Sequence, residues 1–214
     1  MIAKLYKTLF VLTGALIINL FLFYFFGNYG LYSNLILITA TFLIFPSILD
    51  AKKTFKNKKK FEYPRIISHL GFGLLVFFIG INHQHSIETD FNLKVGEKKI
   101  LNNYELSFEN IKIQQNKNYK SVIGDFKITN QTKKNIQHLY PEIRIYTNPE
   151  TLTYEAAIKS KISSDLYLTM SNVSQSEFYN IKFQNKPFMI WIWISAFMIA
   201  LGGFVQLVLK KNEN

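Results

Sequence analysis

The sequence predicts an integral membrane α-helical protein with four transmembrane helices and a small extracytoplasmic antiparallel β domain. Three observations support this class. Four long apolar stretches occur within 214 residues, of which 49% are hydrophobic. The segment 82–186 instead carries alternating polar and apolar residues. Positive charges are concentrated beside the apolar stretches, as is usual in membrane proteins.

The first three spans are expected at about 5–26, 32–49 and 64–81, because one crossing needs about 20 apolar residues. Lys4 and Lys7 make the first span look like a signal peptide. Its apolar core is too long and no small-residue cleavage site follows, so we expect it to be retained. Pro46 interrupts the second span near its end. Residues 187–214 are expected to form the fourth span, over 188–209, and an inner tail.

The positive charges predict the orientation of the chain. The net charge of +11 is concentrated in a basic loop, 51–63, and at the tail, where Lys210 and Lys211 stand. This pattern places the basic loop and both termini on the cytoplasmic or matrix side. Residues 27–33 and 82–186 then lie on the periplasmic or intermembrane side. Trp191 and Trp193 fit an aromatic belt at that side, and we expect membrane lipid, not nucleic acid, as a partner.

The segment 82–186 predicts a β sandwich or barrel. Residues 104–108 and 142–146 alternate polar and apolar side chains, and residues 121–129 are rich in β-branched and aromatic types. The asparagine-rich breaks at 102–103, 116–118 and 130–133 resemble turns. These strands and turns indicate an antiparallel arrangement.

Several kinds of chemistry are excluded by the composition. The chain has no cysteine, and therefore no disulfide, thiolate metal site or thiol nucleophile of its own. Phosphate-binding glycine loops, serine hydrolase motifs and zinc-ligand spacings are also missing. A transporter would need more polar groups within the spans.

His69 is the principal candidate site residue, because an ionisable side chain inside a span is costly and often functional. Neutral imidazole is also a common axial ligand of haem iron. On a helical wheel, Gly73 and Gly80 lie within about 40° of His69. This face would admit a flat macrocycle, with the glycines facing the haem, or another helix. The alternative is that His69 packs between helices or transfers protons.

The other histidines are expected to play lesser roles. His83 and His85 are expected just past the outer end of the third span, as interfacial groups or a weak metal pair. His138 is expected to be a structural histidine of the β domain. Gly202 and Gly203 are expected to serve close helix packing.

An ordered series of short motifs resembles the C-terminal part of the CcmF family of cytochrome c maturation. The series runs from about Pro64 to Lys210 and comprises Ser68–Gly71, Gly80-Ile81, Gly96-Glu97, Asn118-Tyr119, Leu139–Tyr146, Glu155–Ile158, Asp165–Tyr167, Lys186-Pro187, Trp191–Ile194 and Leu201–Gly203. The resemblance implies a subunit of the haem lyase that attaches haem to apocytochrome c. It implies a bound haem b, with His69 as one axial ligand and the second from another chain. A catalytic residue is not implied.

The resemblance also implies partners. These are a CcmE-like haem chaperone, a CcmH-like thiol protein and apocytochrome c. Family members carry a Trp-rich motif and further haem-binding histidines, which do not occur here. The sequence therefore looks like the C-terminal piece of a split protein, whose N-terminal CcmF-like polypeptide would carry that motif. The system would lie in a bacterial or mitochondrial inner membrane.

One different class of function stays open at this point. The spans would then only anchor a β domain that binds a protein partner or acts as a sensor, with no redox role.

The sequence reveals no role for the segment Pro141-Glu142-Ile143-Arg144-Ile145-Tyr146. A purely structural explanation, a turn and strand with an Arg–carboxylate pair, accounts for it at least as well as a functional one.

Overall fold

A computed structural model describes the chain except residues 1, 27–29, 58–61, 132–134, 174–176 and 212–214. Part of the expected basic loop, of the loop 27–33, of the turn 130–133 and of the tail therefore lies outside the described residues. The chain divides into two compact units. One unit comprises residues 1–85 and 187–214, and the other comprises residues 86–186.

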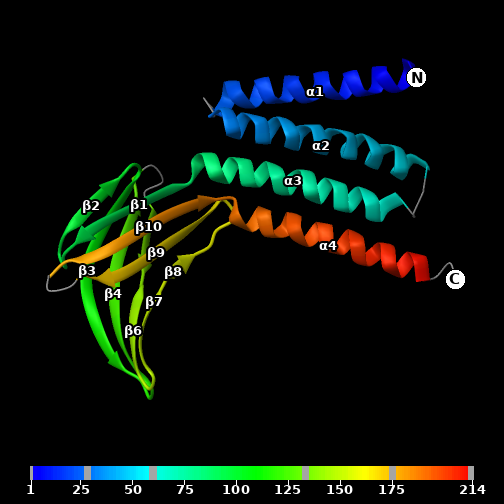
Figure 1. The fold of residues 1–214 in the computed structure, drawn as a ribbon. Coiled ribbons are helices and arrows are strands. Elements are labelled where there is room, and N and C mark those ends of the chain that lie inside the picture. The colour runs from blue at the N-terminus through cyan, green and yellow to red at the C-terminus, as the bar shows by residue number, and fades with distance from the viewer. Residues whose placement is uncertain (1, 27–29, 58–61, 132–134, 174–176, 212–214) are drawn as a thin grey trace. The chain divides into compact units, whose positions relative to one another are not determined.

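The first unit is a row of four helices (Figure 1). They are α1 (Ile2–Phe26), α2 (Leu31–Asn57), α3 (Tyr63–His85) and α4 (Met189–Lys211). Helix α3 packs against α2 on one side and α4 on the other, and α1 packs on α2. By length and composition, α2, α3 and residues Met189–Leu209 of α4 are able to cross a membrane, and α1 contains the shorter apolar run Leu9–Phe21. The four predicted helices are confirmed.

Helix α2 is longer than the predicted second span, 32–49, because it continues through Pro46 to Asn57. Proline removes one N–H from the helical ladder, but neighbouring groups can compensate inside a bundle. The extension is held by contacts that sequence periodicity does not reveal. The buried Thr54 hydroxyl donates to Glu62 Oε2 at 2.9 Å, and Phe55 lies 5.2 Å from Tyr63, ring centre to ring centre. Residues 51–57, which we expected in a loop, are therefore helical.

Helix α3 is also longer than predicted and ends at His85. His83 and His85, which are expected just past the outer end of the span 64–81, lie in the last turn of this helix. Polar contacts support this turn. Asn82 Nδ2 donates to the Pro187 carbonyl at 2.5 Å, and Gln84 Oε1 accepts from the Gly30 amide at 3.4 Å.

The second unit consists of two β-sheets. Its strands are β1 (Ile87–Leu93), β2 (Lys98–Leu101), β3 (Tyr104–Gln115), β4 (Tyr119–Asn130), β5 (Asn135–Leu139), β6 (Glu142–Thr147), β7 (Glu150–Glu155), β8 (Ala157–Lys159), β9 (Ser164–Asn172) and β10 (Tyr179–Pro187). The smaller sheet has the order β1-β10-β9-β8. The larger has the order β2-β3-β4-β6-β7, with β5 also on β4. Every strand pair whose register is described is antiparallel.

The core of this unit lies between the sheets, which defines a sandwich. Phe108 and Phe126 of the larger sheet stack with their ring centres 4.2 Å apart, and both are fully buried. Tyr104 packs on Phe183 of the smaller sheet at 5.4 Å. The core cluster draws residues from both sheets. The three predicted strands are confirmed as parts of β3, β4 and β6, and the predicted antiparallel β domain is confirmed.

Candidate cofactor site on the third helix

The glycines of α3 serve helix packing. A Cβ atom on Gly73 would lie 2.8 Å from Ile44 Cγ1, and one on Gly80 would lie 2.9 Å from Ile36 Cγ2, both in α2. A Cβ on Gly71 would lie 3.0 Å from the Ser195 carbonyl oxygen of α4. The expected haem-facing role of Gly73 and Gly80 is thus corrected, because α2 fills the space in front of both. The close approach of another helix, the alternative for this face, is what the structure shows.

His69 lies on a different strip of α3, which neither neighbouring helix covers. The exposed residues Arg65, His69, Phe72, Ile79 and His83 follow one another at helical spacing. We call this strip the open face. The His69 side chain makes no hydrogen bond, ion pair or ring contact with any residue that the structure describes. Its imidazole is therefore available to a ligand from outside the four helices.

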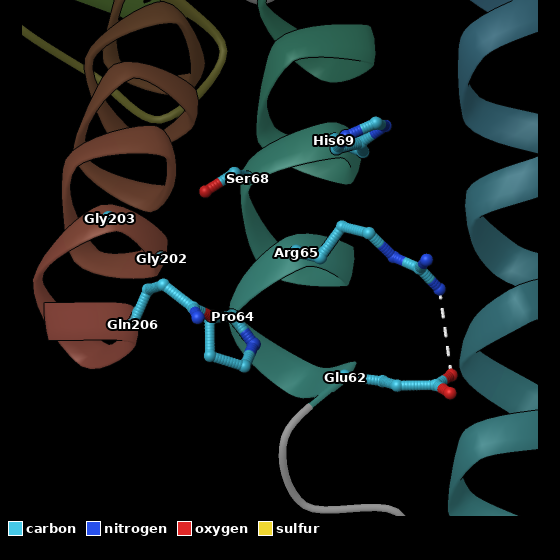
Figure 2. A pocket seen from close by; sticks show the side chains of 8 residues that line it. All are labelled: Glu62, Pro64, Arg65, Ser68, His69, Gly202, Gly203 and Gln206. Atoms are coloured by element: carbon cyan, nitrogen blue, oxygen red, sulfur yellow. Dashed lines mark ion pairs between the residues drawn. The ribbon is translucent and has the colours of Figure 1, made fainter. Parts of the chain in front are cut away.

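Two hollows flank His69. One, of about 480 Å³, lies between α3 and α4 (Figure 2). Its lining comprises Glu62, Pro64, Arg65, Ser68, His69, Gly202, Gly203 and Gln206. A second hollow of about 250 Å³ lies between α2 and α3 and also includes His69. The histidine thus stands between two depressions in the helical row.

The two adjacent glycines of α4 behave differently. A Cβ on Gly202 would lie 2.7 Å from the Pro64 carbonyl oxygen, so this glycine serves the close packing that the sequence predicts. A Cβ on Gly203 would meet nothing within 4 Å. Gly203 leaves the hollow beside His69 open. Neighbouring side chains on a helix point about 100° apart. This angle is the sequence signal that could have shown that Gly202 and Gly203 face different surroundings.

The polar groups around His69 have partners of their own. Ser68 Oγ donates to the Ile199 carbonyl of α4 at 3.3 Å, and its side chain points toward α4 while that of His69 points away (Figure 2). The Arg65 guanidinium lies 3.5 Å from the Glu62 carboxylate and 3.8 Å from that of Asp50. A neutral imidazole beside such a hollow can ligate haem iron or carry a proton.

A six-coordinate haem at His69 would need a second ligand from elsewhere. The chain has three other histidines, His83, His85 and His138. His83 follows His69 by fourteen residues, or about 21 Å along a helix at about 1.5 Å per residue, which is too far to share one iron. His85 lies in the same last turn, and His138 belongs to the β unit.

The remaining predicted residues lie in the β unit. His138 Nδ1 lies 2.9 Å from Asp125 Oδ1, so this histidine has a partner as expected. Arg144 Nε donates to Glu142 Oε2 at 2.9 Å, and its guanidinium lies 3.7 Å from Glu155 Oε1. The hydrogen bond to Glu142 is the main cause that raises the pKa of Arg144. The pair with Glu142 lies within β6, and the contact with Glu155 crosses to β7. An Arg–carboxylate pair is what the structural explanation of this segment expects.

Comparisons with known proteins place this geometry in context. Residues 84–187 match the model of the CcmF C-terminal beta-sandwich family. The chain is 28% identical over 152 residues to the cytochrome c-type biogenesis protein CcmF of Escherichia coli, covering 71% of this chain and 23% of that protein. The CcmF of Haemophilus influenzae is 29% identical over 140 residues, covering 65% and 22%. An uncharacterized mitochondrial protein, ymf2, of Marchantia polymorpha is 34% identical over 73 residues, covering 34% and 23%.

A solved structure titled "Cytochrome c Heme Lyase CcmF" shares the fold. Its TM-score is 0.73 at 15% identity, and the match covers 97% of this chain and 35% of that one. The chain thus spans about a fifth of the length of the curated relatives it matches. The matched part includes both units described above.

Proposed function

Since the chain belongs to the CcmF family, as a counterpart of its C-terminal portion, we propose that it is a membrane subunit of a cytochrome c haem lyase. The relatives are named for cytochrome c-type biogenesis, which supports this role. In this proposal the chain holds a haem b in the membrane and helps other components to transfer haem to apocytochrome c.

The observation that carries the proposal is the exposed, unpartnered imidazole of His69 within a span. His69 is the axial ligand of the haem in this proposal, and the second ligand comes from outside these 214 residues. Bound haem supplies a redox-active iron. The residues of the chain suit such a group. Gly203 leaves open space beside His69, Phe72 offers an apolar contact on the same face, and Arg65 supplies a cation one turn away for the propionates.

The ligand assignment can be tested by visible spectroscopy. The chain is expressed in membranes with its cytochrome maturation partners, purified in detergent and reduced. We expect a low-spin haem b spectrum that His69→Ala abolishes. His83→Ala is the matched control, because His83 lies on the same open face but about 21 Å away. An unchanged spectrum in His69→Ala would remove His69 from the haem site.

We further propose that the β unit lies on the periplasmic or intermembrane side and docks partners. The partners of this proposal are an N-terminal CcmF-like polypeptide, a CcmH-like thiol protein, a CcmE-like haem chaperone and apocytochrome c. Exposed apolar side chains on one face of the larger sheet support a docking role. They are Ile113, Ile145, Leu152 and Tyr154. Ile145 of β6 lies opposite Leu152 of β7, Tyr154 follows two residues along β7, and Ile113 lies on β3, beyond β4.

That same surface is the observation that favours the second class, a membrane-anchored binding module or sensor with no redox role. Two variants, Leu152→Asp and His69→Ala, distinguish the two functions. Leu152→Asp should weaken co-purification of partner proteins in both cases. Only a haem lyase subunit should lose its haem spectrum with His69→Ala. A chain that binds partners but never carries haem would support the binding module.

A further inference from the structure

Three metal-ligating side chains from three strands converge on the β unit. Glu109 of β3, Asp125 of β4 and His138 of β5 each offer one ligand atom, and these atoms all lie within 4.8 Å of one another. Two ligands bound to one Zn²⁺ at about 2.0–2.2 Å lie at most about 4.4 Å apart. A small side-chain adjustment therefore brings the three groups into a coordination sphere.

A β-bulge contributes Glu109 to this cluster. In the pairing of β3 with β4, Phe108 lies opposite Phe126 and Asn110 lies opposite Asp125, so Glu109 is the extra residue. Bulges re-aim side chains and are frequent beside functional sites. Phe108 and Phe126 face the core, and the residues next to them, Glu109 and Asp125, face the other way. The bulge sets both carboxylates on the outer face of the sheet.

The ladder is also open beside Asp125. Strand β5 pairs with Phe126–Asn130, whereas β6 pairs with Tyr119–Ile123. Asp125 lies between these two segments. His138 pairs with Lys127 and reaches Asp125 along the outer face, with Nδ1 at 2.9 Å from Oδ1. The cluster thus lies at the bulge on the β3 side of β4 and at the gap between β5 and β6 on the other side.

In the described part of the chain, His138 is the one basic side chain within ion-pair distance of either carboxylate. Among the described residues, neither Glu109 nor Asp125 forms an ion pair with a lysine or arginine, and His138 is the one side-chain partner of Asp125. Two carboxylates held this close repel each other unless a cation lies between them. A His–Asp hydrogen bond alone would account for two of the three residues and would leave Glu109 unexplained.

We propose that Glu109, Asp125 and His138 bind a divalent first-row transition metal ion such as Zn²⁺. One imidazole and two carboxylates are ligands that suit Zn²⁺ or Mn²⁺ and disfavour Mg²⁺ and Ca²⁺, which prefer oxygen alone. The cation takes the place of the proton in the His138–Asp125 hydrogen bond, and water completes its coordination. It links β3, β4 and β5 at the break in the ladder. The site is independent of the haem proposal.

Binding is tested with Co²⁺ and Zn²⁺ on the full chain in detergent, with no haem added. We expect a visible Co²⁺ absorption band that Zn²⁺ removes by competition. Glu109→Gln and His138→Gln should each weaken Zn²⁺ binding at least tenfold. Glu109 is exposed, so its substitution should leave the fold intact. The double substitution His83→Gln, His85→Gln is the control, because it removes the other histidine pair and should leave the band unchanged.

A second measurement reads the same site through stability. Metal that binds the folded state alone raises the unfolding temperature. Zn²⁺ should therefore raise it in the unmodified chain and in the His83, His85 control, but not in Glu109→Gln. Absence of a Co²⁺ band at millimolar metal, or a Zn²⁺ effect that survives Glu109→Gln and disappears in the control, would overturn the proposal.

Discussion

Two adjacent glycines of α4 make opposite contributions at the scale of single residues. A Cβ on Gly202 would meet the Pro64 carbonyl oxygen at 2.7 Å and the Ser68 amide nitrogen at 2.9 Å, both backbone atoms of α3. Gly202→Ala should therefore push α3 and α4 apart and destabilise the chain by about 1–3 kcal/mol, the usual cost of overpacking. Thermal unfolding in detergent measures the effect. Gly203→Ala is the control, with no expected loss, since its Cβ meets nothing within 4 Å.

Gly203 instead bears on the haem proposal. A bulky side chain at this position fills the hollow beside His69 without displacing a helix. Gly203→Leu should lower the haem content of the purified chain while its unfolding temperature stays unchanged. Haem is quantified from the reduced spectrum per mole of protein. Full haem occupancy in Gly203→Leu would show that the macrocycle does not use this hollow.

The sequence could single out His69 because an ionisable group in an apolar span is rare for a physical reason. It could not assign Gly73 and Gly80. A helical wheel gives the direction of a side chain, but the neighbour in that direction depends on the packing of helices distant in sequence. Here the neighbour is α2, through Ile44 and Ile36. The Glu109, Asp125 and His138 cluster was hidden for the same reason, since it depends on strand register and a bulge.

At the scale of elements, Glu88 joins β1 to β10. Its carboxylate lies 2.5 Å from Lys182 Nζ and 3.2 Å from Lys186 Nζ. Hydrogen bonds, first from Lys182 and then from Lys186, lower the pKa of Glu88 below its ordinary value of 4.5. A lowered pKa in the folded state adds stability above the unfolded pKa, and this stability is lost as pH falls through the folded pKa.

Glu88→Gln should therefore lower the stability of the chain at pH 7 and reduce the loss of stability below about pH 4.5. The effect is small because the side chain is 43% exposed and solvent screens the pair. Urea unfolding midpoints from pH 3 to pH 7 provide the measurement. In a Lys182→Met background the same substitution should have less effect. An equal effect in both backgrounds would contradict the role of this pair.

Strands were more predictable than helix ends. The alternation of polar and apolar side chains in residues 104–108 and 142–146 reflects one buried and one exposed face of each strand. The sequence alone shows this pattern. The ends of α2 and α3 depend on tertiary bonds, Thr54 to Glu62 and Asn82 to Pro187. Such bonds join residues whose proximity the sequence does not show, so the sequence could not predict that α2 continues to Asn57.

At the scale of the whole molecule, the two units divide the expected work. The helical unit carries His69, the proposed haem ligand, and the β unit carries its own core and the proposed docking surface. Strands β1 and β10 pair with each other, with Ile87 opposite Asn185. Strand β1 directly follows α3 in the chain, and β10 directly precedes α4. The chain therefore leaves and re-enters the helical unit from neighbouring strands.

This division makes the orientation in the membrane testable, because the chain has no cysteine and each introduced thiol is a single reporter. Lys117 is exposed in the turn between β3 and β4, and Lys56 is exposed near the end of α2 within the basic region. Since positive charges stay inside, Lys117→Cys should react with a membrane-impermeant maleimide in cells whose outer membrane has been permeabilised. Lys56→Cys should react only after the inner membrane is broken. Glu177→Cys, at another exposed site of the β unit, should follow Lys117→Cys. The reverse pattern would invert the orientation and would place the docking surface out of reach of periplasmic or intermembrane partners.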